Sequence, residues 1–458
     1  MPQLTFLGAA RTVTGSKYLL DTGSHRILFD SGLFQGLKEL RERNWRDLPV
    51  PANTIHTIVL THAHLDHCGY IPRLVSHGFR GRIFCTPGTA DLCRVVLPDA
   101  GRLQEEDARY ANRKGFSRHA PALPLFTEAD AARALTQLQP VGFDRRVGVA
   151  PGVEVTFTPV GHLLGAAAVR VQLEGGRTIV FGGDLGRYNR PVLRDPSPIA
   201  RADVLLIEST YGDRTHEPDD AGARLGDIVR ETIGRGGKVI VPAFAIGRVE
   251  EVLYWLKRLE EDGSIPAVPV FLDSPMALDA LRFYAARANE LDDEYHGERN
   301  SLARFVTARF QGVTSPEHSK ELTASAVPSI VISASGMATG GRVLHHLARA
   351  LPDARNTALF VGYQAPGTRG RSLVDGQTSV KIHGRHIPVA AQISRIDAMS
   401  AHADAAEMVQ WLRQLGTPPD ITYVVHGEVG AIQALQERVA GELGWRTQAP
   451  DYMDQVEI

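Results

Sequence analysis

Four residues that can bind a transition metal fall within six positions of the sequence: His62, His64, Asp66 and His67. They follow directly on residues 55–60, an apolar and β-branched run that is typical of a buried strand. Because alternate residues of an extended chain point to the same side, the first two histidines can reach one ion together. Asp66 and His67 then fall on a turn and face a second point nearby. The spacing predicts two adjacent metal ions and disfavours a polar turn with solvated histidines.

Acidic and imidazole side chains also follow other predicted strands. Such residues recur along the chain: Asp30, His162, Asp184, Glu208, His402 and His426. Open α/β architectures assemble their ligand sites beyond the carboxyl ends of the strands. We therefore expect these residues to gather around the metal-binding stretch.

A hydrolytic site with two ions needs about four protein ligands for each ion, some of them shared. The candidate ligands divide into two sets around one carboxylate: His62, His64 and His162 for one ion, Asp66, His67 and His426 for the other, and Asp184 as the bridge. Imidazole and carboxylate ligands without thiolate suit zinc, with manganese as a substitute. Two such ions would hold a hydroxide as the nucleophile and offset charge on a phosphoryl oxygen. We expect Asp30 to accept the other N–H of a ligand imidazole and so orient it.

Strand and helix patterns alternate along the chain, which predicts an α/β protein. With 458 residues, the chain exceeds what one hydrophobic core usually supports. A segment with its own strand-helix alternation lies between Glu208 and His402, so we expect it to be inserted in the first domain. The expected boundaries are 1–211 and 389–458 for the metal-binding domain and 212–388 for an inserted domain with a parallel sheet.

The bulk composition narrows the protein's environment. The net charge is −2, so a polyanionic partner must be held by a local patch or by metal ions. The three cysteines are odd in number and form no C-x-x-C pair, which argues against a disulfide framework. No apolar run approaches the roughly 18 residues that span a bilayer. We expect a protein of the reducing cytoplasm that is neither secreted nor embedded in a membrane.

Two loops of the predicted inserted domain are candidates for binding phosphate groups. One lies between a predicted strand and a predicted helix, so its amides and the helix N-terminus could hold phosphate. A tight strand-to-helix turn explains its glycines equally well. The second loop adds cations near the next strand end. The candidate phosphate-binding residues are Ser335, Gly336, Gly340 and Arg342 from the first loop and Arg369 and Arg371 from the second.

These motifs together resemble a known family. The H-x-H-x-D-H stretch, with Asp30, His162 and Asp184, resembles the metallo-β-lactamase superfamily. Three further motifs look like those of its β-CASP branch of nucleic-acid nucleases: Glu208 in E-S-T-Y-G, His402 in S-A-H-A-D and His426 in V-H-G-E. The stretches P-A-F-A-I-G-R and S-A-S-G-M look like the branch's inserted domain. The chain is most similar to the bacterial and archaeal homologues of the nuclease subunit of the cleavage and polyadenylation specificity factor.

The resemblance implies a metallo-β-lactamase αββα sandwich with an inserted β-CASP domain. It also implies a hydrolase that cuts RNA phosphodiesters and leaves 5′-phosphate and 3′-hydroxyl ends. His402 would be the general acid and Glu208 would position it, with Asp184 as a further catalytic residue. DNA-directed members typically lack a histidine in the last motif, so His426 favours RNA. The expected cofactors are two zinc ions.

Two alternatives to a ribonuclease remain open. A small-molecule hydrolase, such as a thioesterase or lactonase, can share the metal ligands but needs neither the insertion nor the pair of Glu208 and His402. An inactive RNA-binding scaffold would have lost motif positions, whereas every position is intact here. We expect an endonuclease, with exonuclease activity left open. The expected partner is single-stranded RNA, without a membrane, and a homodimer is left open.

Overall fold

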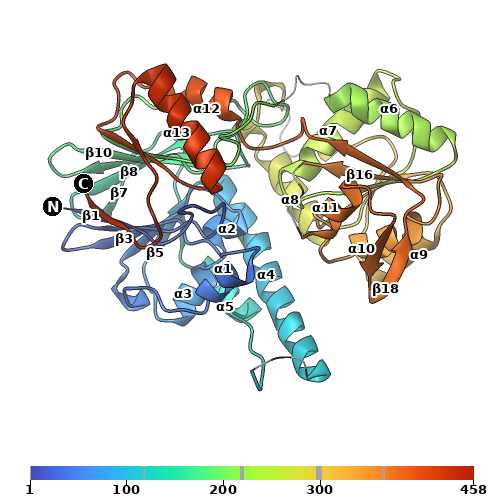
Figure 1. Cartoon of the computed structure of the whole chain (residues 1–458), viewed down its shortest axis with the longest axis horizontal. Helices are drawn as coiled ribbons and strands as arrows, with labels where there is room; N and C mark the ends of the chain where they lie inside the picture. The colour runs from blue at the N-terminus through green and yellow to red at the C-terminus, as the bar shows by residue number, and fades with distance from the viewer. Residues whose placement is uncertain are drawn as a thin grey trace. The chain divides into compact units, whose positions relative to one another are not determined.

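The computed structural model describes residues 2–115, 117, 119–216, 221–295, 302–362, 364 and 367–458 (Figure 1). It divides the chain into two compact units, each described by itself below. Unit 1 comprises Met1–Thr215 and His402–Ile458, and unit 2 comprises His216–Ala401. Within the described ranges, no helix is both long and apolar enough to cross a membrane.

Two seven-stranded sheets form the frame of unit 1. In spatial order, the first sheet contains β22 (Gln455–Glu457), β1 (Gln3–Phe6), β2 (Tyr18–Asp21), β3 (Arg26–Phe29), β4 (Thr57–Val59), β5 (Arg82–Cys85) and β6 (Leu138–Pro140). The second contains β21 (Thr447–Gln448), β20 (Ile421–Val424), β11 (Val204–Ile207), β10 (Thr178–Phe181), β9 (Ala167–Leu173), β8 (Val153–Pro159) and β7 (Val147–Ala150). The last described strand, β22, therefore pairs with the first, β1.

The two sheets pack face to face. Apolar side chains from both sheets form one buried cluster, and within it the rings of Phe29 and Phe181 stack with their centroids 3.9 Å apart. Helices cover the outer faces (Figure 1). They are α1 (Lys38–Arg43), α2 (Leu65–Cys68), α3 (Ile71–Ser76), α4 (Pro87–Lys114) and α5 (Glu128–Leu135) on one side, and α12 (Ala405–Leu412) and α13 (Val429–Leu443) on the other. Unit 1 is thus the expected αββα sandwich.

Parallel strands bring the candidate site residues of unit 1 to one edge. Strands β10, β11 and β20 run parallel, and their carboxyl ends lead to Asp184, Glu208 and His426. In the other sheet β3 and β4 run parallel, and they lead to Asp30 and His62. Because the carboxyl ends of parallel strands meet at the same edge, residues far apart in sequence lie close together.

A six-stranded sheet, parallel throughout, forms the centre of unit 2. Its spatial order is β14 (Phe310–Gly312), β13 (Val270–Leu272), β15 (Ile330–Ser333), β12 (Val239–Pro242), β16 (Thr357–Val361) and β19 (Gln392–Ile396). The central strands are buried along their whole length, as expected for a parallel sheet covered on both faces. The described helices are α6 (Ala221–Gly234), α7 (Arg248–Glu261), α8 (Pro275–Ala286), α9 (Pro316–Ala324), α10 (Val343–Ala350) and α11 (Arg369–Val374), and a hairpin pairs β17 (Ser379–Ile382) with β18 (Arg385–Pro388).

The boundaries of the two units differ from those expected at 211/212 and 388/389. The first lies at 215/216 and the second at 401/402. The second shift has a clear cause, because β19 pairs in parallel with β16 and so completes the sheet of unit 2. The apolar pattern of residues 392–396 indicates a strand, but it does not reveal which sheet that strand joins.

Candidate metal centre

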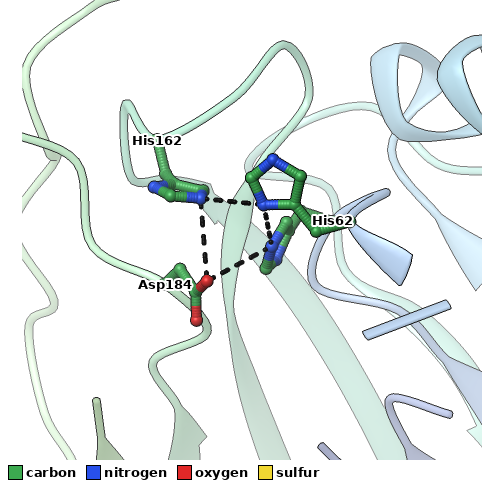
Figure 2. Close-up of side chains that lie close together, drawn as sticks. His62, His162 and Asp184 are labelled. Carbon is green, nitrogen blue, oxygen red and sulfur yellow. Dashed lines mark hydrogen bonds and ion pairs between the residues drawn. The ribbon is translucent and has the colours of Figure 1, made fainter. Parts of the chain in front are cut away.

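Three histidines converge on one point in unit 1. His62 and His64 come from the loop after β4, and His162 from the loop after β8. Nδ1 of His64 lies 3.1 Å from Nε2 of His62 and 3.1 Å from Nε2 of His162. His62 and His162 point toward the carboxylate of Asp184, as Figure 2 shows. Together these four side chains could hold one metal ion.

A second group lies beside the first. Nε2 of His426 lies 3.3 Å from Nε2 of His67 and 3.2 Å from Oδ2 of Asp66. Asp66 and His67 belong to the one-turn helix α2, where a simple turn was expected. These three side chains could hold another ion. The structure thus brings together the two ligand sets that the sequence suggested.

Asp184 stands between the two groups. Its Oδ2 lies 3.5 Å from Nε2 of His62 and 3.6 Å from Nε2 of His162. Its Oδ1 lies 3.2 Å from Nε2 of His67. The two carboxylate oxygens therefore face different groups, which is the arrangement that a bridging ligand needs.

The spacing of the donor atoms suits ligands of a divalent metal ion better than direct hydrogen bonds between the same side chains. When two imidazole nitrogens face each other at 3.1 Å, only one of them can carry the hydrogen. Two ligands bound to one zinc ion at tetrahedral angles lie about 3.3 Å apart, close to the spacings around His64. Oδ1 of Asp184 is also buried and accepts no hydrogen bond among the described residues. Buried polar atoms that make no hydrogen bond are rare in folded proteins, and a metal ion would satisfy this oxygen better than its ion-pair contact with His67.

The ionisation of the ligands follows from burial and neighbouring charge. Burial lowers the pKa of His62 and of His64, which favours their neutral, ligating forms. Burial also acts to lower the pKa of His67, but the carboxylates of Asp184 and Asp30 outweigh it and raise that pKa well above its usual value. For His426, Asp184 and Asp66 likewise outweigh burial and raise the pKa. The two ligand groups therefore differ in how strongly they hold protons.

Release of metal on acidification is expected to occur in two steps. A ligand imidazole must lose its proton to bind metal, so a raised pKa makes protons compete at a higher pH. As the pH falls, a metal ion bound by His67 and His426 should leave before one bound by His62 and His64. Zinc content after dialysis against fixed free zinc between pH 5 and pH 8 would measure this. Release of both ions in a single step would contradict the expectation.

Side chains behind the ligands fix the orientation of the rings. Oδ2 of Asp30 lies 2.8 Å from Nδ1 of His67, as the sequence led us to expect of Asp30. Thr61 donates its N–H and its hydroxyl to the same carboxylate, and its Oγ1 lies 3.0 Å from Nδ1 of His62. Oγ1 of Thr210 lies 3.2 Å from Nδ1 of His426. The sequence analysis assigned no role to these two threonines, although Thr61 directly precedes one motif and Thr210 stands inside another.

Replacing Asp30 with alanine is expected to weaken zinc binding by about 10- to 100-fold, because His67 would lose the acceptor that holds its ring. Competition with a chelator would measure the affinity. Thr22→Ala is a suitable control, since the Thr22 hydroxyl bonds only within its own exposed turn. Unchanged zinc affinity in the Asp30 variant would show that the fold alone holds the ring of His67.

His402 and Glu208 form a pair next to the ligands. Nδ1 of His402 lies 3.0 Å from Oε2 and 3.1 Å from Oε1 of Glu208. Oε1 of Glu208 also accepts the N–H of Leu185, which fixes the carboxylate. The ring of His402 packs against that of His162, with the centroids 4.5 Å apart. Burial acts to lower the pKa of His402, but Glu208 outweighs it and raises that pKa to about 9, so the imidazole can hold a proton at neutral pH.

The candidate phosphate-binding residues share one region of unit 2 but differ in their partners. Ser335, Gly336 and Gly340 lie in the loop after β15, and Arg369 donates to the carbonyl of Ala338 in that loop. Two of the arginines are paired with carboxylates, Arg342 with Asp273 at 2.7 Å and Arg371 with Asp375 at 2.8 Å.

Arg369 differs from the other two arginines. It donates to the carbonyls of Lys381 and Ala338, and no carboxylate of the described chain pairs with it. Its positive charge is therefore the least neutralised of the three, and the structure favours Arg369 over Arg342 and Arg371 as a partner for phosphate.

Comparisons with known proteins agree with this architecture. The family model of the beta-lactamase superfamily domain matches residues 25–231, that of the Beta-Casp domain matches residues 249–373, and that of the Zn-dependent metallo-hydrolase RNA specificity domain matches residues 386–450.

Two curated relatives align over nearly the whole chain. Ribonuclease TTHA0252 of Thermus thermophilus is 37% identical over 94% of this chain and 95% of its own length. Transcription termination factor FttA of Methanosarcina mazei is 30% identical over 100% of this chain and 71% of its own length. Among solved structures, a protein of unknown function from Enterococcus faecalis shares the fold, with a TM-score of 0.56 and 14% identity over the full length of both chains.

Proposed function

The chain belongs to the β-CASP branch of the metallo-β-lactamase superfamily, and on this basis we propose that it is a metal-dependent ribonuclease acting on single-stranded RNA. The observation that carries the proposal is the pair of His402 and Glu208 beside two groups of metal-ligating side chains. The ribonuclease relative, which aligns over nearly the whole chain, supports RNA as the substrate.

The side chains of the site would have different roles in phosphodiester hydrolysis. Divalent ions in the two ligand groups would activate water and offset the negative charge on a phosphoryl oxygen. His402, protonated at neutral pH, would donate its proton to the leaving 3′-oxygen. Glu208 keeps that ring oriented and protonated. The products would then carry 5′-phosphate and 3′-hydroxyl ends.

Several finer features belong to the proposal. We assign zinc to both ligand groups because their donors are imidazole and carboxylate, with manganese as a substitute. We assign internal cleavage as the main mode and leave terminal cleavage open. The homodimer stays a prediction.

Cleavage assays with labelled polymers would test the proposal. Purified protein and its Asp184→Ala variant would be incubated with single-stranded RNA and with DNA of the same sequence, labelled at either end in turn. Metal content would be measured on both preparations. Cleavage selective for RNA and lost with metal in the variant is the expected result. A protein that retains two ions but cleaves neither polymer would instead be tested as a thioesterase or lactonase.

A further inference from the structure

An exposed aromatic ring stands at the carboxyl edge of the sheet in unit 2. Phe244 follows β12, and 41% of its surface is exposed, whereas its neighbours Ala243 and Ala245 are buried. An exposed phenylalanine between buried residues leaves apolar surface in contact with water, which is unfavourable. Single exposed apolar side chains are common on protein surfaces, so the surroundings of the ring must show whether it binds a ligand.

The position of Phe244 is one where α/β sheets bind ligands. From β12 the chain passes through α7 to β13, which lies beyond β15. From β15 it passes through α10 to β16, on the other side of β12. The connections thus leave two neighbouring strands in opposite directions. Such a switch point, at the carboxyl ends of the strands, is the usual ligand position of doubly wound sheets.

The ring of Phe244 rests on the loop that follows β15. A Cβ atom added to Gly336 would lie 2.9 Å from Cδ2 and 3.1 Å from Cε2 of Phe244. Glycine at this position therefore allows the ring to lie against the backbone. In the same loop, Oγ of Ser335 and Oγ1 of Thr339 lie 3.0 Å apart, and Thr339 is exposed. Hydroxyl groups that can bind sugar or phosphate thus accompany the ring.

Two other exposed aromatic residues provide a comparison. Trp45 and Tyr110, both in unit 1, each lie under an arginine, Arg73 and Arg113 respectively. In the part of the chain that the structure describes, neither a cation nor a second aromatic ring lies over Phe244. The exposed part of the ring, 41% of the residue's surface, is thus not covered by a cation or an aromatic ring of the described residues.

A cation bound to the loop that the ring contacts favours an anionic ligand. Arg369 is anchored to the same loop through the carbonyl of Ala338, and no carboxylate of the described residues offsets its charge. A planar group next to an anion is the chemistry of a nucleotide. In single-stranded nucleic acid, bases stack on exposed aromatic rings while cations follow the phosphates.

We propose that Phe244 is a stacking platform for a base of the RNA substrate, with the phosphate of that nucleotide held by Arg369 and the hydroxyls of Ser335 and Thr339. The inference rests on the proposed ribonuclease function and adds a substrate-binding subsite in unit 2. Because every base has a π-face, the subsite would bind without strong sequence preference.

Base removal from the substrate tests the proposal directly. RNA affinity would be measured by fluorescence anisotropy on the metal-loaded full chain carrying His402→Asn, which slows cleavage, with and without Phe244→Leu. The probes are a labelled oligouridylate and an abasic ribose-phosphate oligomer of the same length. We expect Phe244→Leu to weaken oligouridylate binding about 5- to 100-fold and to leave binding of the abasic oligomer unchanged.

Further variants separate stacking from packing. Phe244→Tyr keeps the ring and should retain affinity, whereas Gly336→Ala should displace the ring and behave like Phe244→Leu. Tyr110→Leu removes an exposed aromatic of unit 1 and should have no effect. Equal loss of affinity for both probes in Phe244→Leu, or no loss for either, would overturn the proposal. These affinities do not depend on cleavage, so a wild-type chain that binds but does not cut RNA would contradict only the ribonuclease function.

Discussion

RNA cleavage and metal binding are expected to disappear together when Asp184 is replaced by asparagine. Asparagine has nearly the same size but lacks the negative charge. The two oxygens of Asp184 face His62 and His162 on one side and His67 on the other, so both ligand groups lose a donor at once. We expect kcat/KM for RNA to fall at least about 10³-fold and bound metal to be lost with it. Metal analysis and initial rates on the same preparation would measure both.

A matched control comes from the same unit. Asp420 stands before β20, is exposed, and pairs with Arg177 at 3.3 Å. Asp420→Asn should keep both zinc content and activity, since exposed ion pairs contribute little. If Asp184→Asn lost activity but retained two ions, Asp184 would act in the chemical step without being a ligand. If it retained both, the bridging assignment would be wrong.

Replacing His402 with asparagine is expected to slow the chemical step about 10²- to 10⁴-fold while metal binding persists. Asparagine can still donate to Glu208, but it cannot carry a proton to the leaving oxygen. KM should change less than kcat, because proton transfer is needed in the transition state and not for binding. Loss of zinc in this variant would instead indicate that His402 supports the candidate ligand His162, against whose ring it packs. Such a result would contradict a general-acid role.

The pH profile tests the partnership with Glu208. The acid form of His402 is the active one, so kcat should fall as the pH rises through its pKa, which is about 9 without metal. Bound dications would lower that pKa, so the limb should lie at or below pH 9. Glu208→Gln removes the carboxylate that raises the pKa and should move the limb down by about 1–3 pH units. If the high-pH limb of the kcat profile did not move in this variant, a group other than His402 would be responsible for the limb.

The candidate metal centre could be predicted because its signals are local. His62, His64, Asp66 and His67 lie within six positions after a strand, and the rule for strand ends applies to Asp184 and His426 without knowledge of their neighbours. The insertion was likewise predictable from the alternation of strands and helices. The partners of the candidate phosphate-binding arginines could not be predicted in this way. Arg342 pairs with Asp273, which is distant in sequence and directly follows β13, the strand that pairs with β15.

By itself, the sequence determined which residues could ligate metal and that an α/β domain is inserted between two parts of another, since spacing and periodicity are properties of neighbouring residues. Only the tertiary structure decided that β19 completes the sheet of unit 2, that Thr61 and Thr210 contact the rings of candidate ligands, and that the ring of Phe244 lies against the backbone at Gly336. These features depend on contacts between segments far apart in the chain. The periodicity of one segment does not reveal which other segment packs against it.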